Sequence, residues 1–294
     1  MLEGLLVVNG FIKNKVERFN SLYEDLKKEF LNNDIILKTA TNDELLIIIN
    51  KNIAPKYDFI LFWDKDVNLA YHLEKCGYRV YNSAKSIELC DDKAKTSLIL
   101  ENSGIKVPKT IIAPFTFSNN PFNDNDLKFV DNIINELKLP LVIKESFGSF
   151  GEQVYLLKNK EEIYDIIHKI SPRPFIFQEY IKSSHGRDVR IEVVGGVALG
   201  AVLRESASGD FRSNVLQGGK MTKYSPPQSF IDMAINATKL LGLDFGGVDI
   251  MFGENSEPIL CEVNSNVHFR TFEATTGISL PQVLATYLKE KIKK

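Results

Sequence analysis

The segment that most constrains the fold is residues 246–266, GGVDIMFGENSEPILCEVNSN. Residues 246–252 and 258–264 are apolar runs rich in β-formers, and the residues between them are turn formers. This pattern predicts a β-hairpin centred on the bond between residues 255 and 256. The apolar residues along both runs further indicate that the hairpin belongs to a largely buried sheet.

Three oxygen-bearing side chains meet on one face of this predicted hairpin. The pairing places Asp249 opposite Glu262, and strand alternation puts Asn264 on the same face as Glu262. Two carboxylates and a carboxamide repel one another unless a proton or a cation intervenes, and such ligands suit Mg²⁺ or Mn²⁺. The alternative is a surface hairpin whose polar side chains face water. Because magnesium commonly bridges carboxylates to phosphates, the metal interpretation predicts a nucleotide nearby.

Length and charge narrow the class of protein. A chain of 294 residues with 44% hydrophobic content can form two or three globular domains. Its 36 Lys and Arg against 38 Asp and Glu give a net charge of -2, which argues against nucleic acid or an anionic membrane surface as partner. No apolar run approaches the ~20 residues of a spanning helix, and the N-terminal stretch is interpreted as a strand. Three cysteines without metal-ligand spacing fit a reducing cytoplasm.

The first third of the chain alternates between strand and helix patterns, which predicts a small, mostly parallel α/β domain. The expected strands are residues 5–8, 35–37, 58–62 and 78–81, and the expected helices are residues 13–31 and 67–76. Another helix is expected over residues 91–103, with Lys93 in its first turn. A cation is unfavourable there unless an anion offsets it, so Lys93 indicates a phosphate.

A glycine-containing loop follows the next strand pattern. The strand ends at Lys144, Gly148 and Gly151 lie in the loop, and a second strand covers residues 153–157. Glycines let backbone N–H groups approach an anion closely, and the lysine adds a positive charge at the rim. A plain turn is the alternative. Together with the metal hairpin, the loop is interpreted as a phosphate flap.

Three later segments carry further candidate residues. A buried strand over residues 175–181 can present backbone amides to an adenine, with Glu179 free to accept a ribose hydroxyl. The next strand alternates Asp188, Arg190 and Glu192 on one face, which fits either a salt-bridged surface or the wall of a charged site. A loop over residues 209–220, interpreted either as a surface loop or as part of the site, carries charged and amide groups that suit a transferred phosphoryl group. Those groups are Arg212, Asn214 and Lys220, with Arg204 at the end of the preceding strand.

Taken in order, these motifs resemble the ATP-grasp superfamily, specifically the RimK-like and LysX-like carboxylate–amine ligases, over about residues 91–277. The resemblance implies an α/β chain of the α+β ATP-grasp type. Its N-terminal domain would cover residues 1–90, a central subdomain with the glycine flap residues 91–180, and a C-terminal subdomain with the metal site residues 181–294. The motifs are Asp92-Lys93, Lys144 with its flap, Gln178 to Ile181, Asp188 to Arg190, Gly209 to Asn214, Gly247 to Asp249 and Glu262 to Asn264.

The resemblance also implies a role for each matched residue. Two Mg²⁺ or Mn²⁺ ions would bind Asp249, Glu262 and Asn264, and Arg204, Arg212 and Asn214 would stabilise the phosphoryl and tetrahedral states. The residues expected to hold ATP are Lys93, Lys144, Ser149, Gly151, Glu179, Tyr180, Ile181, Asp188, Arg212, Ser213 and Asn214.

The implied activity is amide bond formation. A substrate carboxylate would be activated by ATP as an acyl phosphate and captured by an amine on an amino acid, a peptide or a carrier protein. After the hairpin, residues 265–270 follow the LysX-like pattern rather than that of the RimK glutamate ligases, which leaves the donor amino acid open. Arg190, His268 and Arg270 are the expected substrate contacts, the last two on an extended segment. The analogy with relatives, which often assemble, allows a homo-oligomer.

Two rival functions share the same nucleotide site. One is an ATP-grasp kinase that phosphorylates a small molecule and stops there. The other is a nucleotide-binding module without catalysis, which a degenerate metal triad or a missing arginine would favour. The triad is intact and both Arg204 and Arg212 are present, which argues against the module. Only product analysis separates the kinase from the ligase, and the resemblance makes the ligase the expected function.

Overall fold

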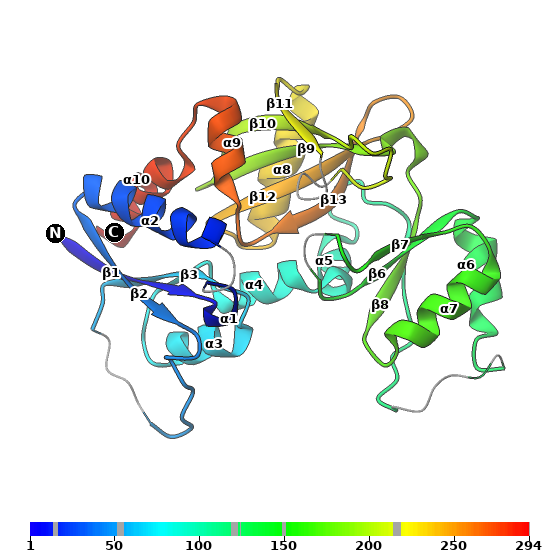
Figure 1. Ribbon diagram of the computed structural model, residues 1–294, viewed down its shortest axis with the longest axis horizontal. Coiled ribbons are helices and arrows are strands. Elements are labelled where there is room, and N and C mark those ends of the chain that lie inside the picture. The colour runs from blue at the N-terminus through cyan, green and yellow to red at the C-terminus, as the bar shows by residue number, and fades with distance from the viewer. Residues whose placement is uncertain are drawn as a thin grey trace.

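The computed structural model describes residues 1–13, 17–51, 56–118, 123, 125–148, 151–213 and 219–293. Its three sheets form an elongated molecule, with the N-terminal sheet at one end, the central sheet at the other and the C-terminal sheet between and above them (Figure 1). The N- and C-terminal ends of the chain lie close together at the N-terminal lobe (Figure 1).

The N-terminal sheet is parallel throughout, which confirms the predicted α/β domain. Its strand order is β2-β1-β3-β4. Alternate residues of β1 face opposite cores: Leu6 and Val8 pack with α2, whereas Leu5 and Val7 pack with α3. The elements are β1 (Leu2–Val8), α1 (Gly10–Lys13), α2 (Glu17–Asn32), β2 (Ile35–Thr41), β3 (Phe59–Trp63), α3 (Val67–Lys75) and β4 (Val80–Tyr81).

The other two sheets are antiparallel. The central sheet has the order β5-β8-β6-β7 and packs against two helices, α6 and α7. Its elements are β5 (Thr110–Ile112), α6 (Phe129–Leu137), β6 (Leu141–Glu145), β7 (Val154–Leu157), α7 (Lys160–Ile170) and β8 (Phe175–Glu179). The C-terminal sheet has the order β11-β10-β9-β12-β13 and packs against α8. Its elements are β9 (Arg187–Val194), β10 (Val197–Glu205), β11 (Lys220–Tyr224), α8 (Gln228–Leu240), β12 (Phe245–Phe252) and β13 (Pro258–Asn264), after the 3₁₀ turn η1 (Lys182–Ser184).

The helix expected over residues 91–103 is wrong in its extent. The structure has two helices, α4 (Ala84–Asp91) and α5 (Lys93–Leu100), separated at Asp92. Asp92 has extended backbone angles, and its carboxylate accepts hydrogen bonds from the amides of Ala94 and Lys95. Aspartate is a strong N-cap, so it begins a new helix instead of continuing the old one. Lys93 does lie in the first turn, as predicted.

The extended segment expected around residues 268–270 is also wrong. Residues Phe269–Thr276 form a helix, α9, which ends at Gly277 with a positive φ of 76°. Phe269 is buried in the core beside α2 and α10 (Leu280–Lys293). Phe272, three residues later, is buried beside Gly200 of β10, and burial of both rings favours the helix. The Gly277 turn therefore ends α9 and does not begin the last helix.

Hydrophobic cores cross the predicted domain boundaries. The core beneath α2 includes Phe245 and Val267 together with residues of α10. Likewise, Cys90 and Leu100 pack with the C-terminal sheet. Each predicted range contains one sheet, but the division at residues 90 and 180 stays a prediction. Within the described ranges, none of the helices is long and apolar enough to cross a membrane.

Candidate functional site

The predicted pairing of Asp249 with Glu262 is present between β12 and β13. It depends on a β-bulge. At the turn end Phe252 pairs with Pro258 and Ile250 with Leu260, and the register then shifts by one at Cys261. The pairs near the turn are symmetric about residue 255 and not about the bond after it. Without the extra residue at Cys261, the same symmetry would place Asp249 opposite Cys261. The predicted turn centre was wrong, and the bulge makes the pairing at the site right.

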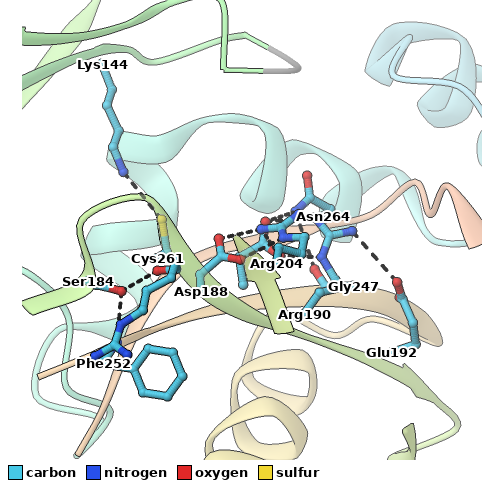
Figure 2. A network of polar contacts seen from close by, with 12 residues as sticks. Lys144, Ser184, Asp188, Arg190, Glu192, Arg204, Gly247, Phe252, Cys261 and Asn264 are labelled. Atoms are coloured by element: carbon cyan, nitrogen blue, oxygen red, sulfur yellow. Dashed lines mark hydrogen bonds and ion pairs between the residues drawn. The ribbon is translucent and has the colours of Figure 1, made fainter. Parts of the chain in front are cut away.

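Asp249 is buried and held by two arginines. Arg190 contacts it through Nε and Nη2, the latter at 2.7 Å from Oδ2. Arg204 Nη2 lies 2.9 Å from Oδ1. The Asn264 amide is also close, with Nδ2 3.4 Å from Asp249 Oδ2. Figure 2 shows both arginines and Asn264 gathered at this point. Although burial opposes ionisation, the two guanidinium groups lower the pKa of Asp249, so it stays a carboxylate.

The charged face of β9 is ion-paired and largely buried, so the alternative of a salt-bridged surface does not hold. Asp188 accepts two hydrogen bonds from Arg204, through Nε at 2.7 Å and through Nη2. Glu192 lies two residues beyond Arg190 on the same face and is 1% exposed. Burial raises the pKa of Glu192 to about 7. These side chains therefore form a buried ionic network rather than a solvated surface.

A pocket beside this network brings together predicted nucleotide and metal residues. Lys93, Lys144, Glu262 and Asn264 all line it. Burial lowers the pKa of Lys93, while nearby Glu262 opposes the effect. Lys144 is buried and directs Nζ toward Cys261, 3.8 Å from Sγ (Figure 2). One buried and one partly buried ammonium group share this pocket with a carboxylate and a carboxamide, which makes it suitable for an anion with a cation beside it.

The pocket also contains residues that the sequence reasoning missed. Lys65 and Asp91 line it and form an ion pair at 3.0 Å. Lys65 follows β3 in the N-terminal sheet, and Asp91 ends α4. Their separation in sequence carries no signal of contact, so only the packing of the N-terminal lobe against α4 and α5 brings them here.

The two predicted loops meet through Arg212. Its guanidinium pairs with Asp210, and its Nη1 donates a hydrogen bond to the carbonyl of Gly151 at 2.7 Å. This contact links the loop after β10 to the glycine loop after β6. Ser213, the next residue, is buried. Ser149 and Asn214 lie outside the described residues.

The end of β8 is less open than expected. Glu179 accepts a hydrogen bond from the Lys109 amide at 2.7 Å, so one carboxylate oxygen already has a partner. The hydroxyl of Tyr180 contacts His185, and its ring lies near Phe211. Ile181 starts the 3₁₀ turn.

His268 and Arg270 lie on the side of the chain that faces α2. Arg270 forms an ion pair with Asp25 at 3.0 Å and contacts Ser21. The His268 ring packs edge-on against Phe19, with ring centroids 5.0 Å apart. Neither lines the pocket that holds Lys93 and Lys144. Their role as substrate contacts stays a prediction.

The fold and the site define a class of protein in which two antiparallel sheets enclose a pocket. The D-alanine–D-alanine ligase from Bacillus anthracis complexed with ATP superimposes with a TM-score of 0.73 over 100% of this chain and 98% of that chain, at 18% identity. At this identity the likeness establishes the ATP-grasp fold alone.

The family follows from sequence. The model of the RimK-like ATP-grasp domain matches residues 90–288, so the chain belongs to this family. The β-citrylglutamate synthase B of Danio rerio is 30% identical over 275 residues, 90% of this chain and 66% of that protein. The N-acetylaspartylglutamate synthase A of Homo sapiens is 33% identical over 225 residues, 76% of this chain and 56% of that protein. The chain therefore spans between about half and two thirds of the length of these relatives.

Proposed function

We propose that the chain is an ATP- and Mg²⁺-dependent carboxylate–amine ligase. The observation that carries the proposal is the pocket that buried Lys144 and partly buried Lys93 line together with Glu262 and Asn264. A phosphate chain would satisfy the two ammonium groups, and a cation would join it to the acidic side. Membership of the RimK-like ATP-grasp family supports the same interpretation.

The donor set fits a divalent cation. Asp249, Glu262 and Asn264 offer only oxygen ligands, which Mg²⁺ and Mn²⁺ prefer. Glu262 and Asn264 line the pocket, whereas both oxygens of Asp249 are engaged by Arg190 and Arg204. A cation at Asp249 would therefore replace an arginine contact. We propose two ions, Mg²⁺ or Mn²⁺, held by these three residues.

ATP, when bound, supplies the phosphoryl group that activates the substrate carboxylate as an acyl phosphate, from which the amine displaces phosphate. Lys93 and Lys144 would hold the phosphates, and an anion beside Lys93 would restore the charge that burial disfavours. Arg212, anchored to Gly151, would close the glycine loop over them. Arg204 would neutralise negative charge that develops on the transferred group. We propose that Ser149, Ser213 and Asn214 complete the nucleotide site, with Glu179, Tyr180, Ile181 and Asp188 at its far end.

Glutamate is the first amine to test, because two relatives are named as synthases of β-citrylglutamate and N-acetylaspartylglutamate. A peptide or a carrier protein as acceptor belongs to the same proposal. The three cysteines are free, which supports the proposed cytoplasmic location. We also retain the three-domain division and a homo-oligomer as proposals.

The test is Mg²⁺-dependent ADP release from ATP across a panel of amino acids and dicarboxylates, with and without hydroxylamine as a surrogate amine. Substrate-dependent ADP release with a hydroxamate product supports the ligase and identifies the acid. ADP release with a stable phosphorylated product and no hydroxamate supports the kinase instead. Glu262→Gln should abolish turnover, whereas Glu254→Gln, at the exposed tip of the same hairpin, should retain it.

A further inference from the structure

A buried group of five charged side chains lies beneath the proposed cation site, with two arginines and three carboxylates. None of the five side chains is more than 14% exposed. The formal charges are therefore two positive and three negative in a region that water barely reaches. The five residues are Asp188, Arg190 and Glu192 on β9, Arg204 on β10 and Asp249 on β12.

Asp249 is shared by both arginines, and each arginine has a second carboxylate nearby. Arg204 already holds Asp188 through two hydrogen bonds. Arg190 turns Nε and Nη2 toward Asp249 and leaves Nη1 3.8 Å from Glu192 Oε1. The other carboxylate oxygen, Glu192 Oε2, is buried without a hydrogen-bond partner. Glu192 is therefore an incompletely paired carboxylate beside an arginine that is committed elsewhere.

Gly247 provides the space in which these two groups meet. A Cβ atom at this position would lie 2.8 Å from Glu192 Oε2 and 2.9 Å from Arg190 Nη1. Both groups thus lie over the same glycine, and this glycine pairs with Asn264 across the hairpin. A movement of about 1 Å would bring the pair from 3.8 Å to hydrogen-bond distance. Figure 2 shows Glu192 on the side of Arg190 away from Arg204.

We infer that Glu192 is a positioning residue that becomes the ion-pair partner of Arg190 when Asp249 binds a cation. The inference rests on the proposed cation site. Once Asp249 turns to a cation, the remaining four groups form two neutral pairs, Arg204 with Asp188 and Arg190 with Glu192. Without Glu192, the same step would leave a buried guanidinium unpaired, which is strongly unfavourable. Glu192 thereby frees Asp249 for the metal.

The experiment measures binding of the non-hydrolysable ATP analogue adenylyl imidodiphosphate by calorimetry, once with Mn²⁺ and once with EDTA. The dissociation constant measured in EDTA divided by the one measured with Mn²⁺ is the ratio that reports the metal-dependent part of binding. Glu192→Gln should reduce this ratio at least tenfold relative to the wild type, while binding in EDTA stays the same. Glu254→Gln is the matched control and should keep the wild-type ratio.

The outcomes separate this inference from the proposed function. If the wild type binds the analogue better with Mn²⁺ and Glu192→Gln does so equally well, the inference is overturned and the cation site stands. If Mn²⁺ does not strengthen binding in the wild type, both the inference on Glu192 and the proposed cation site fail. If Glu192→Gln loses the same affinity for the analogue with Mn²⁺ as with EDTA, Glu192 has a merely structural role and the inference is also overturned.

A second variant guards against loss of folding. Glu192→Asp keeps the charge but withdraws the carboxylate from Arg190 by one methylene group. It should give a ratio between those of the wild type and Glu192→Gln. A ratio equal to that of the wild type would show that reach to Arg190 is unimportant and would contradict the inference.

Discussion

The side chain of Asn82 joins the N-terminal lobe to Phe245, the first residue of β12. Its Nδ2 donates to the Phe245 carbonyl at 2.8 Å and to the Ser265 carbonyl at 3.1 Å. Its Oδ1 accepts from the amides of Asp244 and Phe245. One buried carboxamide thus fixes the start of β12 and the residue that follows Asn264, so both strands of the candidate metal hairpin are anchored by the N-terminal lobe.

Replacing Asn82 should therefore destabilise the protein. Asn82→Ala leaves two buried carbonyls without a donor, and we expect a loss of about 3 kcal/mol in the free energy of unfolding. Asn82→Asp should be worse at neutral pH, because a carboxylate oxygen would face the Phe245 and Ser265 carbonyls. Its stability should recover at acidic pH, where a protonated carboxyl can donate. Urea unfolding at pH 5 and pH 7.5 measures the stability of Asn82→Asp against the wild type. A stability difference that does not change with pH would contradict the predicted recovery.

The two acidic residues of the hairpin should differ in their effects on stability. Asp249→Asn removes a buried carboxylate that two largely buried arginines share, so we expect a loss of about 3–5 kcal/mol together with loss of ADP release. Glu262 is only partly buried, and Glu262→Gln should lose ADP release with a stability change under about 1 kcal/mol. Thermal unfolding and the ADP assay on both variants test this. Full turnover in both would remove the metal assignment.

Arg270→Ala tests the predicted substrate contact. The Arg270 side chain is 51% exposed and pairs with Asp25, so its loss should change stability by less than about 1 kcal/mol. If Arg270 binds a substrate carboxylate, the KM for that substrate rises while kcat is unchanged. Asp25→Asn, which alters the same ion pair, is the control and should leave KM near the wild-type value. An unchanged KM in Arg270→Ala would rule out the contact.

Burial of Glu192 predicts a pH dependence of stability. Its pKa is raised to about 7, so the folded protein holds this proton more tightly than the unfolded chain does. The stabilisation is complete below the ordinary glutamate pKa and is lost as pH rises to about 7. The wild type should therefore lose about 3 kcal/mol relative to Glu192→Gln between pH 4.5 and pH 7.5. Parallel stability curves for the two proteins would contradict this.

Local sequence patterns determined much of the site. Strand alternation placed Asp188, Arg190 and Glu192 on one face, and the structure has them there because a strand has a fixed period of two. The apolar runs of the hairpin identified β12 and β13, whereas the pairing of Asp249 with Glu262 also needs the bulge, which the runs do not predict. Parallel order in the N-terminal sheet followed from alternating strands and helices. Each of these features depends on residues that are neighbours in sequence or across one turn.

The remaining features depended on contacts between distant segments. The sequence alone does not show that Asn82 reaches Phe245 and Ser265, that Lys65 pairs with Asp91, or that Arg270 turns to Asp25. Burial of Phe269 against α2 and α10, and of Phe272 beside Gly200 of β10, favours a helix where local pattern predicted an extended segment. The sequence by itself determined which residue types lie on which face of each strand, because that is set by backbone geometry. Only the tertiary structure decided which charges share a buried environment, because the energy of such groups depends on every neighbour that excludes water.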